Sequence, residues 1–236
     1  MEIQIAVSKT KKYATSDSGD TVEVVERPQG GVSVVLVDGQ SSGRGAKWIS
    51  TMVVRKVITL LAEGVRDGAA ARAASDSLFT ERGGKVSATL NVLSVDRQTN
   101  TVVITRNNPA PVILISGNRL RCLDEFSQSV GRYRDTRPVI NEIPLEIGLT
   151  LIVYTDGLVH SGDRYGNKME IDTCVQALID ENIPSAQHIA DSLLEHALKL
   201  DQNRPSDDIS VVVLQVTEHQ GDDIRRMKVR LPLGKI

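Results

Sequence analysis

Residues 32–63 read VSVVLVDGQSSGRGAKWISTMVVRKVITLLAE, and the expected fold is built outward from this stretch. Residues 32–37 are mostly β-branched or aliphatic, which is typical of a buried strand. Asp38 and Gly39 end this run, and an Asp-Gly pair often forms a turn. Residues 45–63 carry apolar side chains at helical spacing and predict a helix. The stretch therefore predicts a buried strand, a short acidic turn and a long helix in succession.

Other short runs along the chain share this strand-like composition and are bordered by turn residues. They lie at residues 3–7, 22–25, 88–95, 101–105, 112–115, 149–154 and 209–216. Turn signals at residues 97–100 and 116–118 separate neighbouring runs and predict antiparallel hairpins. We therefore expect a meander in the middle of the chain.

Helical periodicity returns in three further segments, residues 69–79, 171–180 and 185–200, with Ser185 as the expected N-cap of the last one. The helices thus come in two pairs, one after the third strand and one before the last. Grouped strands with paired helices favour an α+β layered sandwich over a regular βαβ alternation. We expect one domain over residues 1–218, followed by a charged tail at 219–236 that adds an edge strand.

Composition limits the possible functions. The 236 residues are 40% hydrophobic and 25% charged, which is ordinary for a folded globular protein. The formal net charge of -2 gives no global electrostatic reason to expect nucleic acid or an anionic membrane as a partner. Cys122 and Cys174 are too few for a disulfide framework and are expected to be buried. No window approaches the roughly 18 apolar residues of a membrane span, so a cytoplasmic location is the default expectation.

Acidic residues recur at the borders of the strand-like runs. Asp20 precedes one run, Asp38 and Asp156 each end one, and Asp207 with Asp208 precedes the last. A single such residue usually belongs to a turn. Mg²⁺ and Mn²⁺ prefer oxygen ligands, and carboxylates at the ends of neighbouring strands can converge on one point. The set therefore predicts a divalent-metal site.

These segments resemble the PPM phosphatases, a family that includes the PP2C enzymes and a bacterial SpoIIE-like branch. The resemblance extends over residues 7–216 and includes a stretch similar to the family's central hairpin, at residues 88–114. The matching motifs follow the family's order and are SGD at 18–20, VDG at 37–39 followed by Gly43 and Ala46, YTDGL at 154–158, and DDIS at 207–210.

The resemblance implies a four-layer α/β/β/α sandwich, with two mainly antiparallel sheets flanked by helix pairs and two Mn²⁺ or Mg²⁺ ions at one end. It implies that Asp38 bridges the two ions. Asp20 and the Gly39 carbonyl would bind one ion, and Asp156 and Asp207 the other. Water activated between the ions would attack phosphorus in line, so no protein nucleophile is required.

The sequence also departs from the family's pattern. Residues 107–109 read Asn-Asn-Pro where relatives often carry an aromatic residue or Gly-His. The arginine that binds substrate phosphate in some PP2C enzymes has no clear counterpart near the N-terminus. Arg44 is a candidate by proximity, and the alternative is a solvated side chain at a helix start. Asp208 is either a direct ligand or a support for one.

The Asp207-Asp208 pair and the short chain favour the SpoIIE-like branch. That resemblance implies a serine/threonine phosphatase whose partner is a phosphorylated regulatory protein, such as an anti-sigma-factor antagonist. Regulation would come from partner binding, through the helix pair that begins at Gly45. Neither nucleic acid nor a membrane is expected as a partner, and the oligomeric state is left open.

Two other functions remain as alternatives. Residues 39–43 match the Gly-x-Ser-x-Gly nucleophile elbow of α/β-hydrolases, which would make Ser41 a nucleophile. The lack of βαβ alternation and of an oxyanion-loop motif argues against it. A non-catalytic, phosphoprotein-binding member of the same fold is the second alternative, and the presence of all four expected aspartates argues against lost catalysis. The histidines that could serve a hydrolase as a base are His160, His188, His196 and His219.

Overall fold

The computed structural model describes residues 1–117, 119–180 and 185–232. It contains two five-stranded sheets in which all neighbouring strands are antiparallel. The first sheet has the order β1 (Glu2–Thr10), β10 (Ile209–Thr217), β9 (Thr150–Tyr154), β6 (Val112–Ser116) and β7 (Arg119–Leu123). The second has the order β2 (Thr21–Glu26), β3 (Val32–Gly39), β4 (Ala88–Asp96), β5 (Thr101–Asn107) and β8 (Val139–Pro144).

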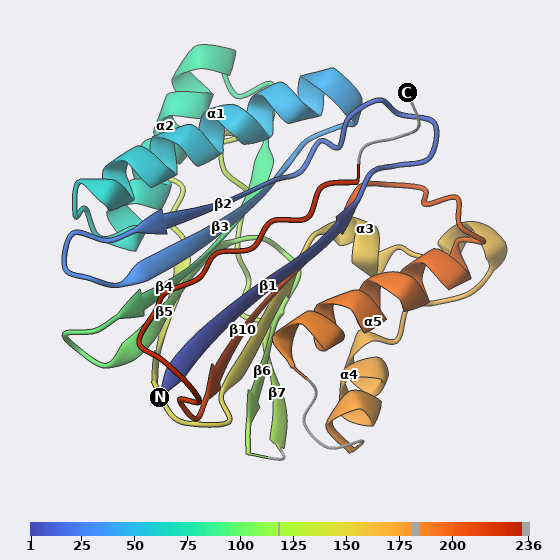
Figure 1. The fold of residues 1–236 in the computed structure, drawn as a ribbon. Helices are drawn as coiled ribbons and strands as arrows, with labels where there is room; N and C mark the ends of the chain where they lie inside the picture. The colour runs from blue at the N-terminus through green and yellow to red at the C-terminus, as the bar shows by residue number, and fades with distance from the viewer. Residues whose placement is uncertain (118, 181–184, 233–236) are drawn as a thin grey trace.

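Helices cover the outer faces of both sheets (Figure 1). One pair lies on the second sheet and the other pair on the first, which confirms the expected sandwich with helix pairs. A short helix and a single 3-10 turn lie between β9 and the second pair. The helices are α1 (Gly43–Ala62), α2 (Asp67–Arg82), α3 (Asp156–Val159), the 3-10 helix η1 (Asp163–Tyr165), α4 (Ile171–Asp180) and α5 (Ala186–Leu200).

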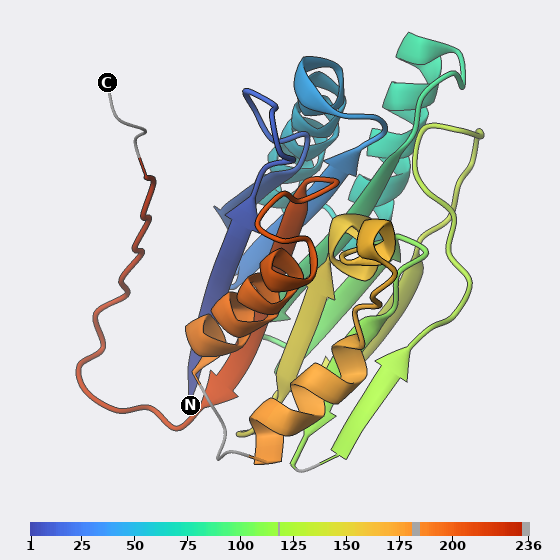
Figure 2. The same cartoon turned by 90° about the vertical axis from the view of Figure 1, so that its right-hand side faces the viewer.

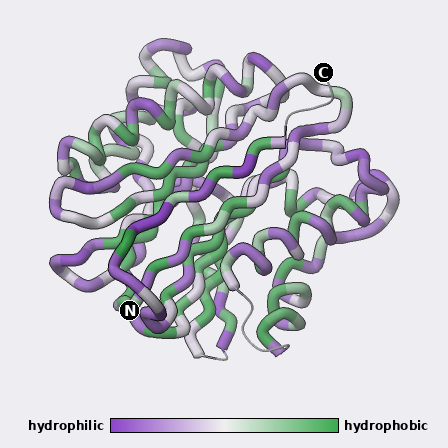
Figure 3. The backbone as a smooth tube through the Cα atoms, in the orientation of Figure 1, coloured by the Kyte–Doolittle hydropathy of each residue, from purple (hydrophilic) through white to green (hydrophobic). Residues whose placement is uncertain are grey.

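Three apolar clusters separate the four layers. The uninterrupted apolar run of strand β3 contributes to two of these clusters, because successive side chains of a strand point to opposite faces. Val34 and Leu36 pack between the two sheets, whereas Val35 and Val37 pack under α1 and α2. Hydrophobic residues accordingly follow the strands through the centre of the molecule (Figure 3). The third cluster lies between the first sheet and helices α4 and α5.

The four predicted helices keep their periodicity and differ from prediction only at their ends, whereas α3 and η1 were not predicted. The buried residues of α1 recur every three or four positions from Ala46 to Leu61, so one face rests on the sheet. At the start of α5 the Ser185 side chain accepts a hydrogen bond from the His188 N–H, which confirms Ser185 as N-cap. In the described parts of the chain, every helix is too short or too polar to span a lipid bilayer.

Two sequence-based expectations about the strands were wrong. The chain does not form one meander in its middle, because β4 and β5 pair in the second sheet while β6 and β7 pair in the first. The tail forms no strand between residues 218 and 232, and it runs outside the sandwich (Figure 2). Arg225 of the tail pairs with Glu26 at 2.6 Å, a contact between exposed side chains. Asn118 of the predicted turn and residues 233–236 lie outside the described residues.

Candidate metal centre

The strand pairing brings acidic residues together at one end of each sheet. In the second sheet, Thr21 pairs with Val37, so Asp20 at the start of β2 lies beside Asp38 at the end of β3. In the first sheet, β9 ends beside the start of β10. Asp156, which follows β9, is therefore near Asp207, which precedes β10. Each sheet contributes two carboxylates.

Glycines next to two of these aspartates allow close backbone contacts. A Cβ on Gly39 would lie 2.1 Å from the Ala46 carbonyl oxygen of α1. A Cβ on Gly157 would lie 2.0 Å from the Asp208 carbonyl oxygen. Since real Cβ atoms do not approach backbone this closely, only glycine permits β3 to meet α1 and α3 to meet the segment before β10.

Hydrogen bonds to Asp20 join the two sheets at this end of the molecule. The Asp20 side chain is fully buried, and its Oδ2 accepts hydrogen bonds from Ser210 Oγ at 2.6 Å and from Thr155 Oγ1 at 3.2 Å. Thr155 and Ser210 are also bonded to each other through backbone groups and the threonine hydroxyl. Asp20 from the second sheet is thus oriented by residues of the first sheet.

The pKa of Asp38 responds to the other three aspartates. The pKa of Asp38 is raised to about 9, first by burial and then by the negative charges of Asp20, Asp156 and Asp207. Burial also raises the pKa of Asp20 to about 6 and raises that of Asp207. A divalent cation bound among these carboxylates would relieve the repulsion that protonation otherwise relieves.

The chemistry of these residues fits a divalent cation, although their side chains are not arranged around one point. In residues 1–117, 119–180 and 185–232, no three acidic, histidine or cysteine side chains form a ready ligand group around one point. However, Asp20 Oδ1 is buried without a hydrogen-bond partner among the described residues, while its Oδ2 has two donors. A buried anionic oxygen without a donor is costly unless it binds a cation. Oxygen donors are also the ligands that Mg²⁺ and Mn²⁺ prefer.

Asp208 supports the site from behind. Its Oδ1 accepts a hydrogen bond from the Lys12 N–H at 2.9 Å, and its Oδ2 accepts one from the Gly19 N–H at 2.8 Å. The side chain is buried, and both of its oxygens are used by the segment that leads into Asp20. This geometry favours the second of the two roles that the sequence left open, since Asp208 holds the backbone next to a candidate ligand.

Asn108 is a functional candidate that sequence reasoning did not identify. It is buried, and its Nδ2 donates a hydrogen bond to the Tyr154 carbonyl at 3.2 Å, two residues before Asp156. Its Oδ1 accepts from the Ala110 N–H at 3.0 Å, and the buried guanidinium of Arg106 donates to its carbonyl at 2.8 Å. The sequence did contain a signal for it: the polar run Arg-Asn-Asn at the end of an apolar strand. Polar residues in such a place are usually buried only when they form hydrogen bonds.

Residues 28–217 match the family model of stage II sporulation protein E (SpoIIE). This match covers most of the 236 residues. The chain belongs to the SpoIIE family. The match begins after Asp20 and includes the other three aspartates of the candidate centre. Among curated proteins, none matches the sequence.

Solved structures share the fold of this SpoIIE-family chain. The PP2C phosphatase domain of Bacillus subtilis SpoIIE, with a fragment of its regulatory domain, aligns at a TM-score of 0.78 and 18% identity, over 92% of this chain and 64% of that one. The RsbU and RsbW domains of a Mycobacterium tuberculosis protein align at a TM-score of 0.73 and 18% identity, over 93% of this chain and 61% of that one. The catalytic domain of the serine/threonine phosphatase PstP was solved with two manganese ions. It aligns at a TM-score of 0.70 and 16% identity, over 92% of this chain and 99% of that one.

The SpoIIE structure is described as a PP2C phosphatase domain and PstP as a serine/threonine phosphatase. Sequence identity to these neighbours is low enough that the comparison shows the fold alone. The chain spans less than two thirds of the length of the Bacillus subtilis SpoIIE structure. The expected PPM sandwich and the SpoIIE-like branch are both confirmed.

Arg44 is the second residue of α1 in this SpoIIE-family chain. Its side chain is exposed and forms no hydrogen bond or ion pair in the described part of the chain. The sequence-based alternative, a solvated side chain at a helix start, describes its position correctly. An unpaired guanidinium five residues after Gly39 is nevertheless free to bind an anion.

Ser41 has one feature of a nucleophile elbow, a positive φ of 83° in the turn between β3 and α1. The sheet around it is antiparallel, unlike that of an α/β-hydrolase. Within the described residues, no histidine is bonded to Ser41. His160 instead contacts Asp163, His188 contacts Ser192, and His219 contacts Glu2 and Asp223. The catalytic triad expected of a serine hydrolase is therefore not assembled in this part of the SpoIIE-family chain.

Proposed function

We propose that this chain is a metal-dependent phosphatase that removes phosphate from serine or threonine of a regulatory phosphoprotein. Family membership and the PP2C-type fold support the reaction class. Two observations carry the proposal: the negative charges of Asp20, Asp156 and Asp207 raise the pKa of Asp38, and Asp20 Oδ1 is buried without a hydrogen-bond partner among the described residues. Residues 1–218 are proposed as the catalytic domain.

Two Mn²⁺ or Mg²⁺ ions would be held by Asp20, Asp38, Asp156, Asp207 and the Gly39 carbonyl, with Asp38 shared between them. The manganese ions in the PstP structure support this choice of metal. When bound, such ions supply an activated water and neutralise the charge of the phosphoryl oxygens. No histidine, cysteine or serine of the chain is required as a nucleophile.

The other residues of the site act by orienting the ligands. Thr155 and Ser210 occupy one oxygen of Asp20 and leave the other free. Asp208 fixes the backbone before Asp20, and Asn108 fixes the backbone before Asp156. Mutation of residues that orient metal ligands in this way typically lowers metal affinity or activity by about 10- to 100-fold.

The substrate is proposed to be a phosphorylated regulatory protein of the anti-sigma-factor-antagonist kind. Membership of the SpoIIE family supports this class, as does the similarity to a structure that contains RsbU and RsbW domains. Arg44 is proposed to bind a substrate phosphate oxygen, because α1 has no acidic residue in its first turn to compete with an anion. The cytoplasmic location expected from composition stays a prediction.

Hydrolysis of p-nitrophenyl phosphate tests the proposal. Turnover should require Mn²⁺ or Mg²⁺, stop on addition of EDTA, and fall by at least about 1,000-fold in Asp38→Asn, because several kcal/mol of charge stabilisation is lost. Ser41→Ala should keep its activity. Turnover that survives EDTA and is lost in Ser41→Ala would identify a serine hydrolase, whereas binding of a phosphoprotein without any turnover would identify a non-catalytic member.

A further inference from the structure

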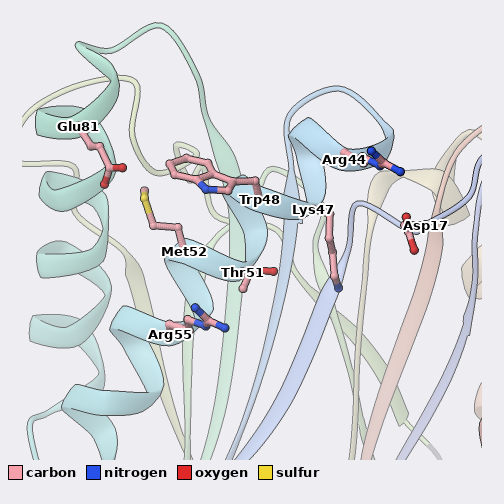
Figure 4. A pocket seen from close by; sticks show the side chains of 8 residues that line it. All are labelled: Asp17, Arg44, Lys47, Trp48, Thr51, Met52, Arg55 and Glu81. Atoms are coloured by element: carbon pink, nitrogen blue, oxygen red, sulfur yellow. The ribbon is translucent and has the colours of Figure 1, made fainter.

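A groove of about 570 Å³ lies along the outer face of α1 (Figure 4). Asp17 lies at one end of it, and Glu81 of α2 lies across from the helix at the other. The lining residues of α1 recur at helical spacing and so form one continuous face. They are Arg44, Lys47, Trp48, Thr51, Met52 and Arg55. We call this feature the α1 groove.

One end of the α1 groove adjoins the candidate metal centre. Lys47 Nζ donates hydrogen bonds to the Asp20 carbonyl at 2.9 Å and to Thr21 Oγ1 at 2.9 Å. Asp17 belongs to the same segment as Asp20, and Arg44 follows the end of β3. A chain that enters the metal centre could therefore continue directly into the groove.

The groove offers unpaired positive charge. The guanidinium groups of Arg44 and Arg55 form no hydrogen bond or ion pair in the parts of the chain that the structure describes. Lys47 bonds only neutral oxygens, so its charge is not neutralised. A fourth cation, Arg82, lies over the Trp48 ring at 4.0 Å. The three lining cations outnumber the two lining carboxylates, Asp17 and Glu81, and Arg82 adds a further positive charge beside the groove.

Trp48 gives the groove an apolar anchor. Its side chain is 41% exposed although tryptophan is usually well buried, and it projects toward α2 beside Met52. Met52 is partly buried, whereas Trp48 and the arginines are exposed. Tryptophan, methionine and arginine together are typical of protein-binding surfaces. This mixture favours a peptide over a small anion, since a small anion would need only the charges.

We propose that the α1 groove binds an acidic segment of the phosphoprotein substrate, next to the phosphorylated residue; this inference rests on the proposed function. Arg44 and Arg55 are separated by about 16 Å along the helix axis, given a rise of about 1.5 Å per residue. An extended chain covers that distance in about five residues. With the substrate phosphate at Arg44, as proposed above, acidic side chains about five residues further along the substrate should lie at Arg55.

Fluorescence of Trp48 provides a direct test, because it is the single tryptophan of the chain. The full-length Asp38→Asn variant is titrated with a phosphoserine peptide that carries glutamates five residues to either side, and with a glutamine version of it. We expect saturable quenching or a shift of emission with the glutamate peptide. Its Kd should rise about fivefold in Arg55→Ala, as for loss of one exposed ion pair, and should stay the same in Lys56→Ala. Lys56 is the matched control because it is exposed on α1 outside the groove.

Equal affinity for the two peptides, the absence of any change in emission, or equal losses in Arg55→Ala and Lys56→Ala would overturn the docking proposal. The titration does not need turnover, so failure of the docking proposal can be distinguished from failure of the proposed phosphatase activity. A chain that binds the glutamate peptide through Arg55 but never hydrolyses p-nitrophenyl phosphate with Mn²⁺ would support the docking proposal and contradict the proposed phosphatase activity. In an active enzyme, Arg55→Ala should raise KM for the glutamate peptide alone and leave hydrolysis of p-nitrophenyl phosphate unchanged.

Discussion

Asp20 is the residue whose environment defines the proposed centre most closely. It is fully buried and has two hydroxyl donors on one oxygen and none on the other among the described residues. The donors, Thr155 and Ser210, fix the direction of the free oxygen. Their importance could not be predicted from sequence, because Ser210 is 190 residues away from Asp20 along the chain.

Ser210→Ala should lower the affinity for Mn²⁺ by about 10- to 100-fold, because Asp20 loses a donor that orients it. Turnover of p-nitrophenyl phosphate should recover at saturating Mn²⁺, which distinguishes a positioning role from a collapsed site. Ser33→Ala is the control, since Ser33 is equally buried but bonds Ser94 at 2.6 Å. A metal titration of turnover measures both variants, and equal metal affinity in wild type and Ser210→Ala would contradict the role.

The pKa of Asp38 predicts how the metal-free protein responds to pH. Below the ordinary aspartate pKa the side chain is protonated in both the folded and the unfolded state, so its ionisation does not lower the free energy of unfolding. Above the folded pKa of about 9 it is ionised in both states, and the repulsion fully destabilises the fold. In EDTA, Asp38→Asn should therefore be more stable than wild type, by a margin that grows from pH 5 to pH 8.

Urea denaturation at the two pH values measures that margin. A wild-type protein that is the more stable of the two at pH 8, or a margin that does not change with pH, would show that Asp38 is not held among like charges.

At the scale of elements, the sequence predicted the strands with β-branched runs and missed two strands with mixed polar composition. Strands β7 and β8 escaped prediction because about half of their side chains meet solvent and neither carries a β-branched run like those of the other two edge strands, β1 and β2. The polar alternation of β7 and β8 resembles that of a loop. The exchange of the chain from the second sheet to the first after β5 was also missed, since strand composition does not specify the partner strand.

Gly157→Ala should be among the more damaging single-methyl changes in the chain. The added Cβ would lie 2.0 Å from the Asp208 carbonyl oxygen, so α3 would have to move away from β10 and carry Asp156 with it. We expect a loss of about 1–3 kcal/mol in the free energy of unfolding and a weaker Mn²⁺ response.

Gly45→Ala is the matched control for that change. Gly45 lies in the first turn of α1, its added Cβ would meet nothing within 4 Å, and its φ is not positive. This variant should be about 0.5–1 kcal/mol more stable than wild type. Thermal and urea unfolding of both variants decide the matter; a Gly157→Ala protein as stable as Gly45→Ala would contradict the close packing.

At the scale of the whole molecule, the candidate centre is a junction between the two sheets. Asp20 and Asp38 come from the second sheet, and Asp156 and Asp207 come from the end of the first. The family resemblance carried by these motifs was enough to predict the sandwich, whereas metal binding by the four aspartates stays a prediction. The supporting contacts of Asp208 and of the buried polar residue Asn108 depend on how the sheets face one another, which no local pattern contains.

Metal binding at such a junction should stabilise the entire fold. Mn²⁺ at about 100 times its Kd should add about 2.7 kcal/mol per site to the free energy of unfolding, because the ions bind the folded state alone. The melting temperature should rise with Mn²⁺ concentration in wild type and much less in Asp38→Asn. The same rise in both proteins would place the ions elsewhere.

The most direct test of the account is anomalous X-ray diffraction at the manganese absorption edge, from crystals of the wild-type protein soaked in Mn²⁺. The account predicts two anomalous peaks at the end of the sandwich, with Asp38 in contact with both ions, Asp20 with one and Asp156 and Asp207 with the other. Manganese peaks only at other places on the protein, or none while these carboxylates turn away from one another, would contradict it.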